Sequence, residues 1–344
     1  NIYDLNSASL KPENYKNKPI RNNLKVISFN EYMMDKDQKK LKIIIASDLN
    51  YNKIKKFLLS KNFIEDQDFC KYKKIAAIWP FKLENKTHLW RTDILMTEKC
   101  TLDCTFCNMY MPHYKNAKHR DLNEIKSDIS IYFKKIDYVS VLHMVGGEPL
   151  MYPHFREALD YIGKNFRNKI GHLLISTNGT LVPKEETLNL IKKYSGLVYI
   201  SDYTDGINYK RKFNQVIESI KKYKINHLIR KDISWIDFGD PNVEKFHSVE
   251  EQIAHFDSCT APYRGLNNSK YYYCHLNTSA VLAGITPENE NDYISLNEGT
   301  KSEEILKFDL GFPKLGYVTF CKNCNGCNTG INIPVSFESQ GLRK

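Results

Sequence analysis

The most informative stretch of the chain is RTDILMTEKCTLDCTFC, residues 91–107. Its first part, residues 91–96, is the first strand candidate of a region in which strand and helix patterns alternate. The second part holds Cys100, Cys104 and Cys107 in a CxxxCxxC pattern, with the aromatic Phe106 before the last cysteine. Three thiolates in one short loop can bind one face of a single inorganic centre. The stretch therefore predicts a strand that leads into a metal-binding loop.

Two kinds of metal centre are compatible with these three cysteines. A structural zinc site needs a fourth ligand, and His113 or His119 is available for that purpose. A [4Fe–4S] cluster on three cysteines leaves one iron open for a further ligand. Disulfides are not expected, because eight of the nine cysteines fall in two groups, with Cys70 apart, in a chain of 344 residues that shows no secretory signal.

The segments that follow alternate between strand and helix patterns. Strands are expected at residues 91–96, 138–144, 172–176, 197–201 and 227–230. Apolar residues at helical spacing predict helices between them, at residues 122–133, 155–162, 188–194 and 213–220. Such alternation predicts a parallel sheet, and five or six repeats predict an α/β fold of the partial (β/α)6 TIM-like barrel type. Function in such folds lies at the C-terminal ends of the strands.

The chain is less regular on either side of this region. Residues 24–29 have a strand pattern, and an isoleucine-rich run at 41–46 precedes a helix that starts at Ser47-Asp48 and ends at Asn62. These patterns predict a small N-terminal α/β module. Beyond about residue 235, loops rich in Cys, Gly and Asn are expected up to Gly330. The expected domains are residues 1–88, 89–235 and 236–344.

Polar and glycine-rich motifs follow the expected strands. After the second strand come two glycines, which allow a ligand to approach the backbone, and a glutamate that can bind a cationic amino group: Gly146, Gly147, Glu148 and Pro149. After the third strand, Ser176 and Asn178 offer hydrogen bonds to a ribose or a carboxylate, although an ordinary polar turn fits them equally well.

A second group of cysteines lies in the C-terminal part of the chain. Cys259 and Cys274 flank a segment that ends in three tyrosines, and Cys321, Cys324 and Cys327 follow after a gap. Four or five thiolates at these spacings can enclose a metal completely, as structural zinc or as an iron–sulfur cluster.

Together, the CxxxCxxC loop and the GGE motif resemble those of the radical SAM superfamily, from about Leu89 to Gly330. The resemblance implies that Cys100, Cys104 and Cys107 hold a [4Fe–4S] cluster whose open iron is chelated by S-adenosylmethionine (SAM). It further implies reductive cleavage of SAM to methionine and a 5′-deoxyadenosyl radical, which abstracts hydrogen from a substrate. An electron donor such as flavodoxin or ferredoxin is implied as well.

The same resemblance suggests which residues contact the cofactor. Glu148 would bind the SAM amino group, and Arg230 would pair with the SAM carboxylate or serve a structural role. Ser201-Asp202 resembles the family's serine-and-aspartate region, although the spacing departs from it. The expected cofactor contacts are Phe106, Gly146, Gly147, Glu148, Pro149, Ser176, Asn178, Ser201 and Arg230. No catalytic acid or base can be selected.

The second cysteine group resembles the twitch form of the SPASM extension, which binds an auxiliary [4Fe–4S] cluster. This implies an iron–sulfur cluster-binding C-terminal extension with Cys259, Cys274, Cys321 and Cys324 as ligands and Cys327 as a substitute. The full SPASM extension has more cysteines, and Gly265 lies further from Cys274 than the usual pattern puts it. A four-thiolate zinc site is the alternative.

An auxiliary cluster can accept an electron from a substrate radical, which favours dehydrogenation, with epimerisation second. Residues 43–69 and the Cys321–Gly326 tail resemble radical SAM proteins of polysaccharide biosynthesis, so a sugar, amino sugar or nucleotide-linked sugar is the expected substrate. The alternative is a peptide-modifying maturase, whose frequent N-terminal winged helix is not matched by residues 1–88. A non-enzymatic scaffold is least favoured.

Composition supports a globular protein, with 42% hydrophobic and 26% charged residues. The net charge of +10 comes from dispersed lysine pairs rather than a basic block, so no nucleic-acid partner is expected. The longest apolar run, Ile75 to Phe81, is far shorter than the roughly 20 residues of a membrane span. A cytoplasmic enzyme without a membrane partner is expected.

Overall fold

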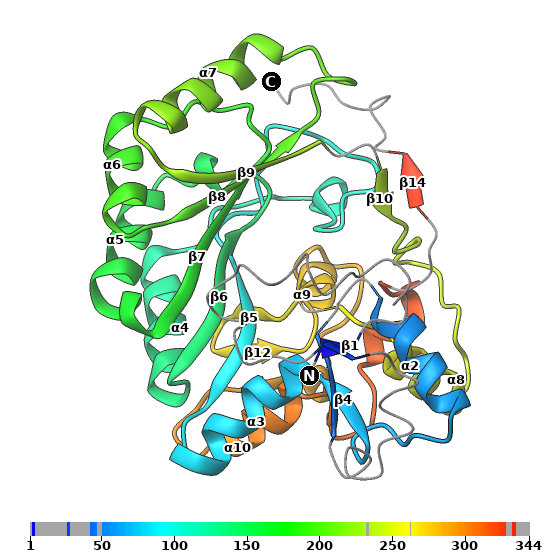
Figure 1. The fold of residues 1–344 in the computed structure, drawn as a ribbon. Helices are drawn as coiled ribbons and strands as arrows, with labels where there is room; N and C mark the ends of the chain where they lie inside the picture. Colours follow the sequence, from blue (N-terminus) through cyan, green and yellow to red (C-terminus); the bar gives the residue numbers. More distant parts are fainter. Residues whose placement is uncertain are drawn as a thin grey trace. The chain divides into compact units, whose positions relative to one another are not determined.

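The computed structural model describes residues 2–3, 26–27, 42–46, 50–231, 234–261, 263–327 and 332–334 (Figure 1). The chain divides into two compact units, Asn1–Trp79 and Pro80–Lys344. The expected helix start at Ser47-Asp48 and most of the expected strand at 24–29 lie outside the described residues. The domain boundaries expected at residues 88 and 235 stay predictions.

The first unit contains two pairs of parallel strands. The strands β1 (Ile2–Tyr3) and β2 (Val26–Ile27) form one pair, and β3 (Ile43–Ile45) and β4 (Phe69–Lys71) form the other. The helix α2 (Tyr51–Ser60) connects β3 to β4, and α3 (Tyr72–Glu84) follows. The core of this βαβ unit consists of Ile43, Ile45, Tyr51, Leu58 and Phe69. The sequence thus predicted the α/β character of the segment but not its second strand.

The second unit is built on a sheet whose first five strands are parallel neighbours in chain order. The strands and helices are β5 (His88–Leu95), α4 (Leu122–Lys135), β6 (Tyr138–Val145), α5 (Phe155–Phe166), β7 (Ile170–Thr177), α6 (Glu185–Lys193), β8 (Leu197–Asp202), α7 (Lys210–Lys222) and β9 (Asn226–Lys231). Three short 3-10 helices connect them: η4 (Met111–His113), η5 (Pro149–Met151) and η6 (Arg167–Lys169). The predicted strands and helices are confirmed to within a few residues.

The two faces of this sheet differ in their neighbours. Thr92 of β5 hydrogen-bonds Tyr132 of α4 (2.8 Å between hydroxyl oxygens), so even-numbered residues of β5 face the helices. Figure 1 shows α4–α7 along this side of the curved sheet. Odd-numbered residues of β5, including Asp93, therefore face the opposite, concave side, because side chains alternate along a strand. The concave side carries α9 (His275–Leu282), from which His275 contacts Asp93.

The chain beyond residue 235 is more regular than the sequence predicts. Its elements are β10 (Ser234–Ile236), α8 (Val249–Ser258), β11 (Gly265–Asn267), β12 (Lys270–Tyr272), α9, η7 (Glu290–Asp292), β13 (Tyr293–Ser295), α10 (Ser302–Asp309), η8 (Thr319–Asn323) and β14 (Asn332–Pro334). The expectation of loops alone was wrong, because strands of three residues are too short to produce a recognisable period.

Three of these strands extend the central sheet. The order in the eight-stranded sheet is β13-β12-β11-β5-β6-β7-β8-β9, so β11 joins β5 at the edge opposite β9. β11 is parallel to β5, and β12 and β13 are antiparallel additions. In the described residues the sheet has free ends at β13 and β9. The sixth parallel strand is β11, which lies beside β5 and not beside β9. The fold is a mixed α/β structure with an open, barrel-like sheet.

A buried ion pair holds the added hairpin on the sheet. Arg120 donates to Asp128 of α4 (2.7 Å), and both side chains are almost fully buried (5% and 2% exposed). The second carboxylate oxygen of Asp128 accepts the backbone N–H of Ser269, in the turn between β11 and β12 (2.6 Å). Arg120 also donates to the carbonyl oxygen of Leu95 at the end of β5. One carboxylate thus joins α4, the hairpin and the segment around the first cysteine loop.

None of the helices in the described ranges combines the length and the apolar character that a membrane crossing requires.

Replacing Asp128 by Ala (Asp128→Ala) should lower the free energy of unfolding by about 3–5 kcal/mol, because it leaves the buried guanidinium of Arg120 without its carboxylate. Urea unfolding followed by circular dichroism measures this loss. The matched control is Asp205→Ala, which removes an exposed carboxylate paired with Lys231 and should leave the midpoint unchanged. Equal midpoints for both variants would contradict the role of the pair.

Candidate functional site

The first cysteine loop starts where β5 ends. Thr97 forms an isolated bridge with His119, whose ring Nδ1 lies 2.8 Å from the Thr97 hydroxyl. Cys100 is buried, whereas Cys104 and Cys107 are half-buried. The backbone N–H of Leu102 donates to Cys100 Sγ at 3.4 Å, and Cys107 N–H donates to the carbonyl oxygen of Cys104. The three thiols are therefore carried by one compact loop at the C-terminal end of a sheet strand.

The GGE motif packs directly on this loop. The N–H groups of Gly147 and Glu148 donate to the carbonyl oxygens of Thr97 and Lys99, both at 2.9 Å. A Cβ atom on Gly147 would lie 2.2 Å from the carbonyl oxygen of Lys99 and 2.9 Å from the Cβ of Cys100. The sequence predicted that the glycines allow close approach of a ligand. The structure shows that they allow close approach of the cysteine loop itself.

Glu148 is completely buried between two strand ends. Its carboxylate accepts the N–H of Leu150 (3.1 Å) and the N–H of Asn178 after β7 (2.8 Å). Burial raises the pKa of Glu148 to about 7, although the bonds from Asn178 and Leu150 oppose the change. A cationic group bound beside it would favour the charged carboxylate. Glu148 therefore has the environment of a carboxylate that gains from an ammonium ligand.

Asn178 completes the contact between the motifs. Its side-chain amide donates to Cys100 Sγ (3.6 Å) and to the Thr101 hydroxyl (2.9 Å), and its Oδ1 accepts from Thr180. The phenol of Tyr209 donates to the backbone carbonyl oxygen of Asn178. The structure thus brings together Cys100, Gly147, Glu148 and Asn178, which lie in three separate motifs of the sequence.

The donor set fits a [4Fe–4S] cluster. Three thiols lie in one loop, and two N–H groups already point at the sulfur of Cys100, as donors do around iron–sulfur clusters. In the part of the chain that the structure describes, no three Cys, His, Asp or Glu side chains are arranged to hold a single metal ion. A cluster of four irons has no such requirement, because each of its thiolates binds a different iron.

The other residues predicted at the cofactor lie in different surroundings. Phe106 is half-exposed (51%), and Pro149 is buried as the first residue of η5. Ser201 and Arg230 are register neighbours on β8 and β9, and Arg230 donates to the Tyr199 hydroxyl. Ser176 hydrogen-bonds His143 (2.6 Å) on the concave face of the sheet. These five residues therefore lie outside the hydrogen bonds that join Cys100, Glu148 and Asn178.

Sequence reasoning missed a buried polar network on the concave face. Asp93 of β5 is its centre: His275 Nδ1 lies 2.6 Å from one carboxylate oxygen, and Arg91 Nε lies 2.6 Å from the other. His143 Nδ1, on β6, lies 3.3 Å from Asp93 and 2.6 Å from Arg91. Burial by itself would raise the pKa of Asp93, but Arg91 and His143 hold it well below its usual range. Burial lowers the pKa of His143.

One buried nitrogen of this network lacks a hydrogen-bond partner among the described residues. The Nε2 atom of His275 is buried, and no described residue hydrogen-bonds it. The rings of Tyr263 and His275 stack with 4.7 Å between their centroids. The guanidinium of Arg91 lies over the Tyr263 ring, 4.7 Å from its centroid. Asp93 and His143 are ionisable residues within strands of the central sheet, and this is the signal that marks them in the sequence. His275 has no such signal, since it reaches Asp93 only in the folded chain.

The second cysteine group also comes together. Cys259 ends α8, Cys274 precedes α9, Cys321 lies in η8 and Cys324 ends it. The thiol of Cys327 hydrogen-bonds Cys259, which lowers the pKa of Cys259 and raises that of Cys327. Cys274, Cys321 and Cys324 are close enough to influence one another and Cys259. All five thiols, including that of Cys327, therefore lie near one another.

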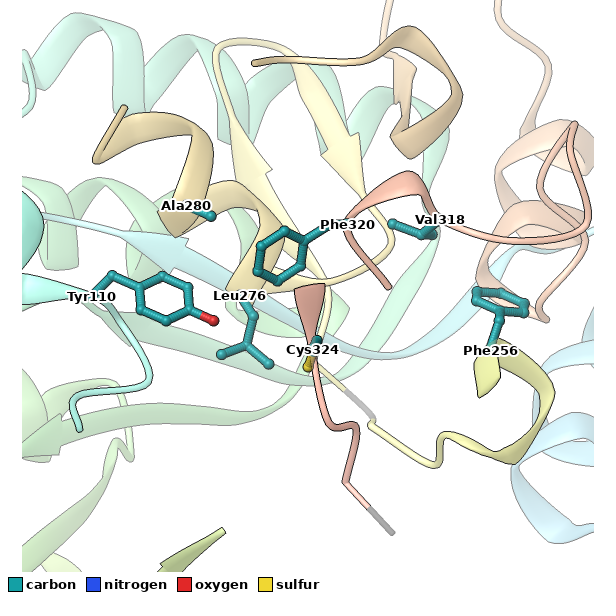
Figure 2. Close-up of a cluster of buried hydrophobic side chains, with 7 residues drawn as sticks. All are labelled: Tyr110, Phe256, Leu276, Ala280, Val318, Phe320 and Cys324. Carbon is teal, nitrogen blue, oxygen red and sulfur yellow. The ribbon is translucent and has the colours of Figure 1, made fainter. Parts of the chain in front are cut away.

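Apolar side chains surround this group (Figure 2). Cys324 packs in a cluster with Tyr110, Phe256, Leu276, Ala280, Val318 and Phe320, and Cys274 and Cys321 lie at its margin. Burial raises the pKa of Cys274 to about 12 and that of Cys324 to about 11. These thiols are therefore protonated unless a metal centre displaces their protons.

Comparison with known proteins gives one family match. Residues 94–240 match the family described as "Radical SAM superfamily". A curated relative is the antilisterial bacteriocin subtilosin biosynthesis protein AlbA of Bacillus subtilis (strain 168), 29% identical over 114 residues. The match covers 33% of this chain and 23% of AlbA, so the chain spans about a quarter of the length of that relative.

Among solved structures, the complex of BtrN with AdoMet and 2-DOIA matches 74% of this chain and 98% of its own, at 14% identity and a TM-score of 0.48. Native anSMEcpe with bound AdoMet and Cp18Cys peptide matches 43% of this chain and 44% of its own, at 21% identity and a TM-score of 0.35. Streptococcus suis SuiB bound to precursor peptide SuiA matches 53% and 44%, at 16% identity and a TM-score of 0.34.

The family match starts within β5 and includes the cysteine loop, the GGE motif and Asn178. The geometry around Cys100 and the match therefore concern the same residues. Residues 94–240 are thus similar to the radical SAM superfamily, a family that binds a [4Fe–4S] cluster and SAM.

Proposed function

We propose that this chain is a radical SAM enzyme that modifies a peptide and carries a second, auxiliary iron–sulfur cluster. The observation that carries the proposal is the meeting of Cys100, Glu148 and Asn178 at the strand ends of a radical SAM domain. The peptide substrate is supported by the relative AlbA, which takes part in bacteriocin biosynthesis by its name. The sugar substrate and carbohydrate pathway expected from the sequence have no support in the comparisons.

The residues of the first site would share three tasks. Cys100, Cys104 and Cys107 would hold the cluster, which together with bound SAM supplies the 5′-deoxyadenosyl radical. Glu148 would accept hydrogen bonds from the SAM ammonium group, which compensates for the burial of its carboxylate. Asn178 would keep the Cys100 sulfur in place through its amide N–H.

The concave network would position a polar group of the substrate. Asp93 orients the His275 ring through Nδ1, and this leaves Nε2 as the polar atom that a bound molecule can hydrogen-bond. His275 directly follows Cys274, so this polar atom and the second cysteine group are carried by the same end of α9. The reaction type, whether oxidation, epimerisation or cross-linking, stays open in this proposal.

The function is tested by measuring 5′-deoxyadenosine and peptide mass after anaerobic incubation with SAM, dithionite and short peptides encoded beside the gene. The expected result is SAM cleavage that the peptide stimulates, with a mass change in the peptide. Cys104→Ala should abolish 5′-deoxyadenosine formation, whereas Cys70→Ala, which changes a thiol of the first unit, should not. Stimulation by nucleotide sugars but not by peptides would contradict the peptide proposal, and an active Cys104→Ala would contradict the radical SAM assignment.

Replacing Glu148 by Gln should weaken SAM binding about 10- to 100-fold, since a hydrogen bond to a charged group contributes about 1.5–3 kcal/mol. Anaerobic equilibrium dialysis with the reconstituted protein measures the affinity. The control is Glu98→Gln, because Glu98 is a buried carboxylate of the first cysteine loop whose oxygen accepts the N–H of Lys118. Unchanged affinity in Glu148→Gln would remove Glu148 from the SAM site.

Reconstituted protein should hold about eight irons per chain, four for each of two clusters, and no stoichiometric zinc. Cys274→Ala should reduce the content to about four, because it removes a ligand of the auxiliary cluster. Cys327→Ala should leave it near eight, because four other thiols remain. Iron, sulfide and zinc analysis of the three proteins distinguishes an auxiliary cluster from a zinc site at the second cysteine group. Four irons with one zinc in the unmodified chain would identify that group as a zinc site.

A further inference from the structure

Tyr110 connects the two cysteine groups of the chain. It follows the first cysteine motif by three residues, yet its side chain belongs to the apolar cluster around Cys324. Figure 2 shows the ring reaching toward Leu276 and Cys324 with the hydroxyl at its leading end. The side chain is 4% exposed, and its ring meets Phe320 edge-on at 6.3 Å.

The hydroxyl of Tyr110 has no hydrogen-bond partner among the described residues. Buried tyrosine hydroxyls normally have one, and an unsatisfied polar group costs about 1–3 kcal/mol. Two other buried tyrosines of the same unit illustrate this rule: Tyr132 bonds Thr92, and Tyr271 donates to Asp309. A phenylalanine would fill the same apolar space without this cost, so the hydroxyl requires a partner that the described residues do not supply.

The backbone holds Tyr110 in this position at a further cost. Its φ angle of +56° lies in the left-handed region, which non-glycine residues seldom adopt. Its N–H donates to the carbonyl oxygen of Cys107 (2.9 Å), and its own carbonyl accepts the N–H of His113 (2.9 Å). Strained conformations of this kind persist where the surrounding structure requires them. The first cysteine loop therefore aims Tyr110 at the second cysteine group.

Cysteine side chains lie beside the Tyr110 ring. Cys324 packs in the same apolar cluster as Tyr110, and Cys274 and Cys321 pack against that cluster. A phenol O–H is a hydrogen-bond donor, and thiolates or the sulfides of a cluster are acceptors. Cysteines of the second group and a donor that has no acceptor among the described residues thus occupy the same apolar space.

We propose that Tyr110 is a positioning residue that donates its hydroxyl to a sulfur atom of the auxiliary cluster and thereby raises the reduction potential of that cluster. The inference rests on the proposed function, because it requires a cluster at the second cysteine group. A hydrogen bond to cluster sulfur stabilises the reduced, more negative state. Loss of the bond therefore makes the cluster a weaker electron acceptor.

The test compares Tyr110→Phe with a matched control, Tyr114→Phe. Tyr114 is a half-buried tyrosine of the loop after Cys107, and its hydroxyl donates to the carbonyl oxygen of Ser279 (3.3 Å). Redox titration of the reconstituted proteins, followed by electron paramagnetic resonance, gives the potential of each cluster. Addition of SAM distinguishes the two, since only the signal of the SAM-binding cluster responds to it.

The expected result is a shift of the auxiliary potential to a more negative value in Tyr110→Phe and none in Tyr114→Phe. Electron–nuclear double resonance should detect an exchangeable proton coupled to the auxiliary cluster, which disappears in D₂O and in Tyr110→Phe. Incorporation of 3-fluorotyrosine at position 110 gives a stronger donor of the same shape, so the potential should move in the positive direction. This second variant tests the inference if Tyr110→Phe fails to retain its iron.

Two outcomes overturn the inference, and they are distinguishable. An unmodified chain whose only cluster signal responds to SAM has no auxiliary cluster, and the corresponding part of the proposed function fails with it. An unmodified chain with two clusters, whose auxiliary potential and proton coupling are the same in Tyr110→Phe, overturns the inference alone.

Discussion

Close packing of Gly146 and Gly147 against the first cysteine loop is the constraint on which the site depends. The absence of side chains at these positions lets the backbone after β6 hydrogen-bond the backbone after β5, where a Cβ atom would collide with Lys99 and Cys100. Glu148 follows directly and is placed between Leu150 and Asn178, and Asn178 then reaches Cys100. Three strand ends are joined in this way into one surface, although their motifs are separated by tens of residues.

The two cysteine groups lie in opposite kinds of environment. The first is surrounded by hydrogen-bonding groups such as Asn178, Thr101 and Glu148, which suit a centre that binds a charged cofactor. The second lies among Phe256, Leu276 and Phe320, where water is excluded and hydrogen bonds to sulfur have a larger effect. Polar surroundings at one group and apolar surroundings at the other agree with different tasks for two clusters. Tyr110 belongs to the loop of the first and to the core of the second.

The C-terminal part of the chain is integrated with the segment that matches the radical SAM superfamily rather than attached beside it. β11 pairs with β5, Asp128 of α4 binds the turn that follows β11, and His275 of α9 binds Asp93. The helix that carries His275 begins immediately after Cys274. Because each contact joins residues of both parts, the second cysteine group, the concave polar network and the first cysteine loop are all positioned by the same sheet.

Local pattern was sufficient to predict the five parallel strands, the four helices between them, the CxxxCxxC loop and the GGE motif, because each depends on residues that are close in sequence. The same holds for the α/β character of the first unit. Short strands such as β11 and β12 could not be predicted, since three residues carry no period and their pairing with β5 depends on the folded sheet. The partners of Asp93, Ser176 and Tyr110 were equally beyond reach, because burial and long-range contacts select them. A site formed by one loop can be recognised from the sequence, because its residues are neighbours in the chain. A site formed by two distant segments depends on the tertiary packing that brings those segments together.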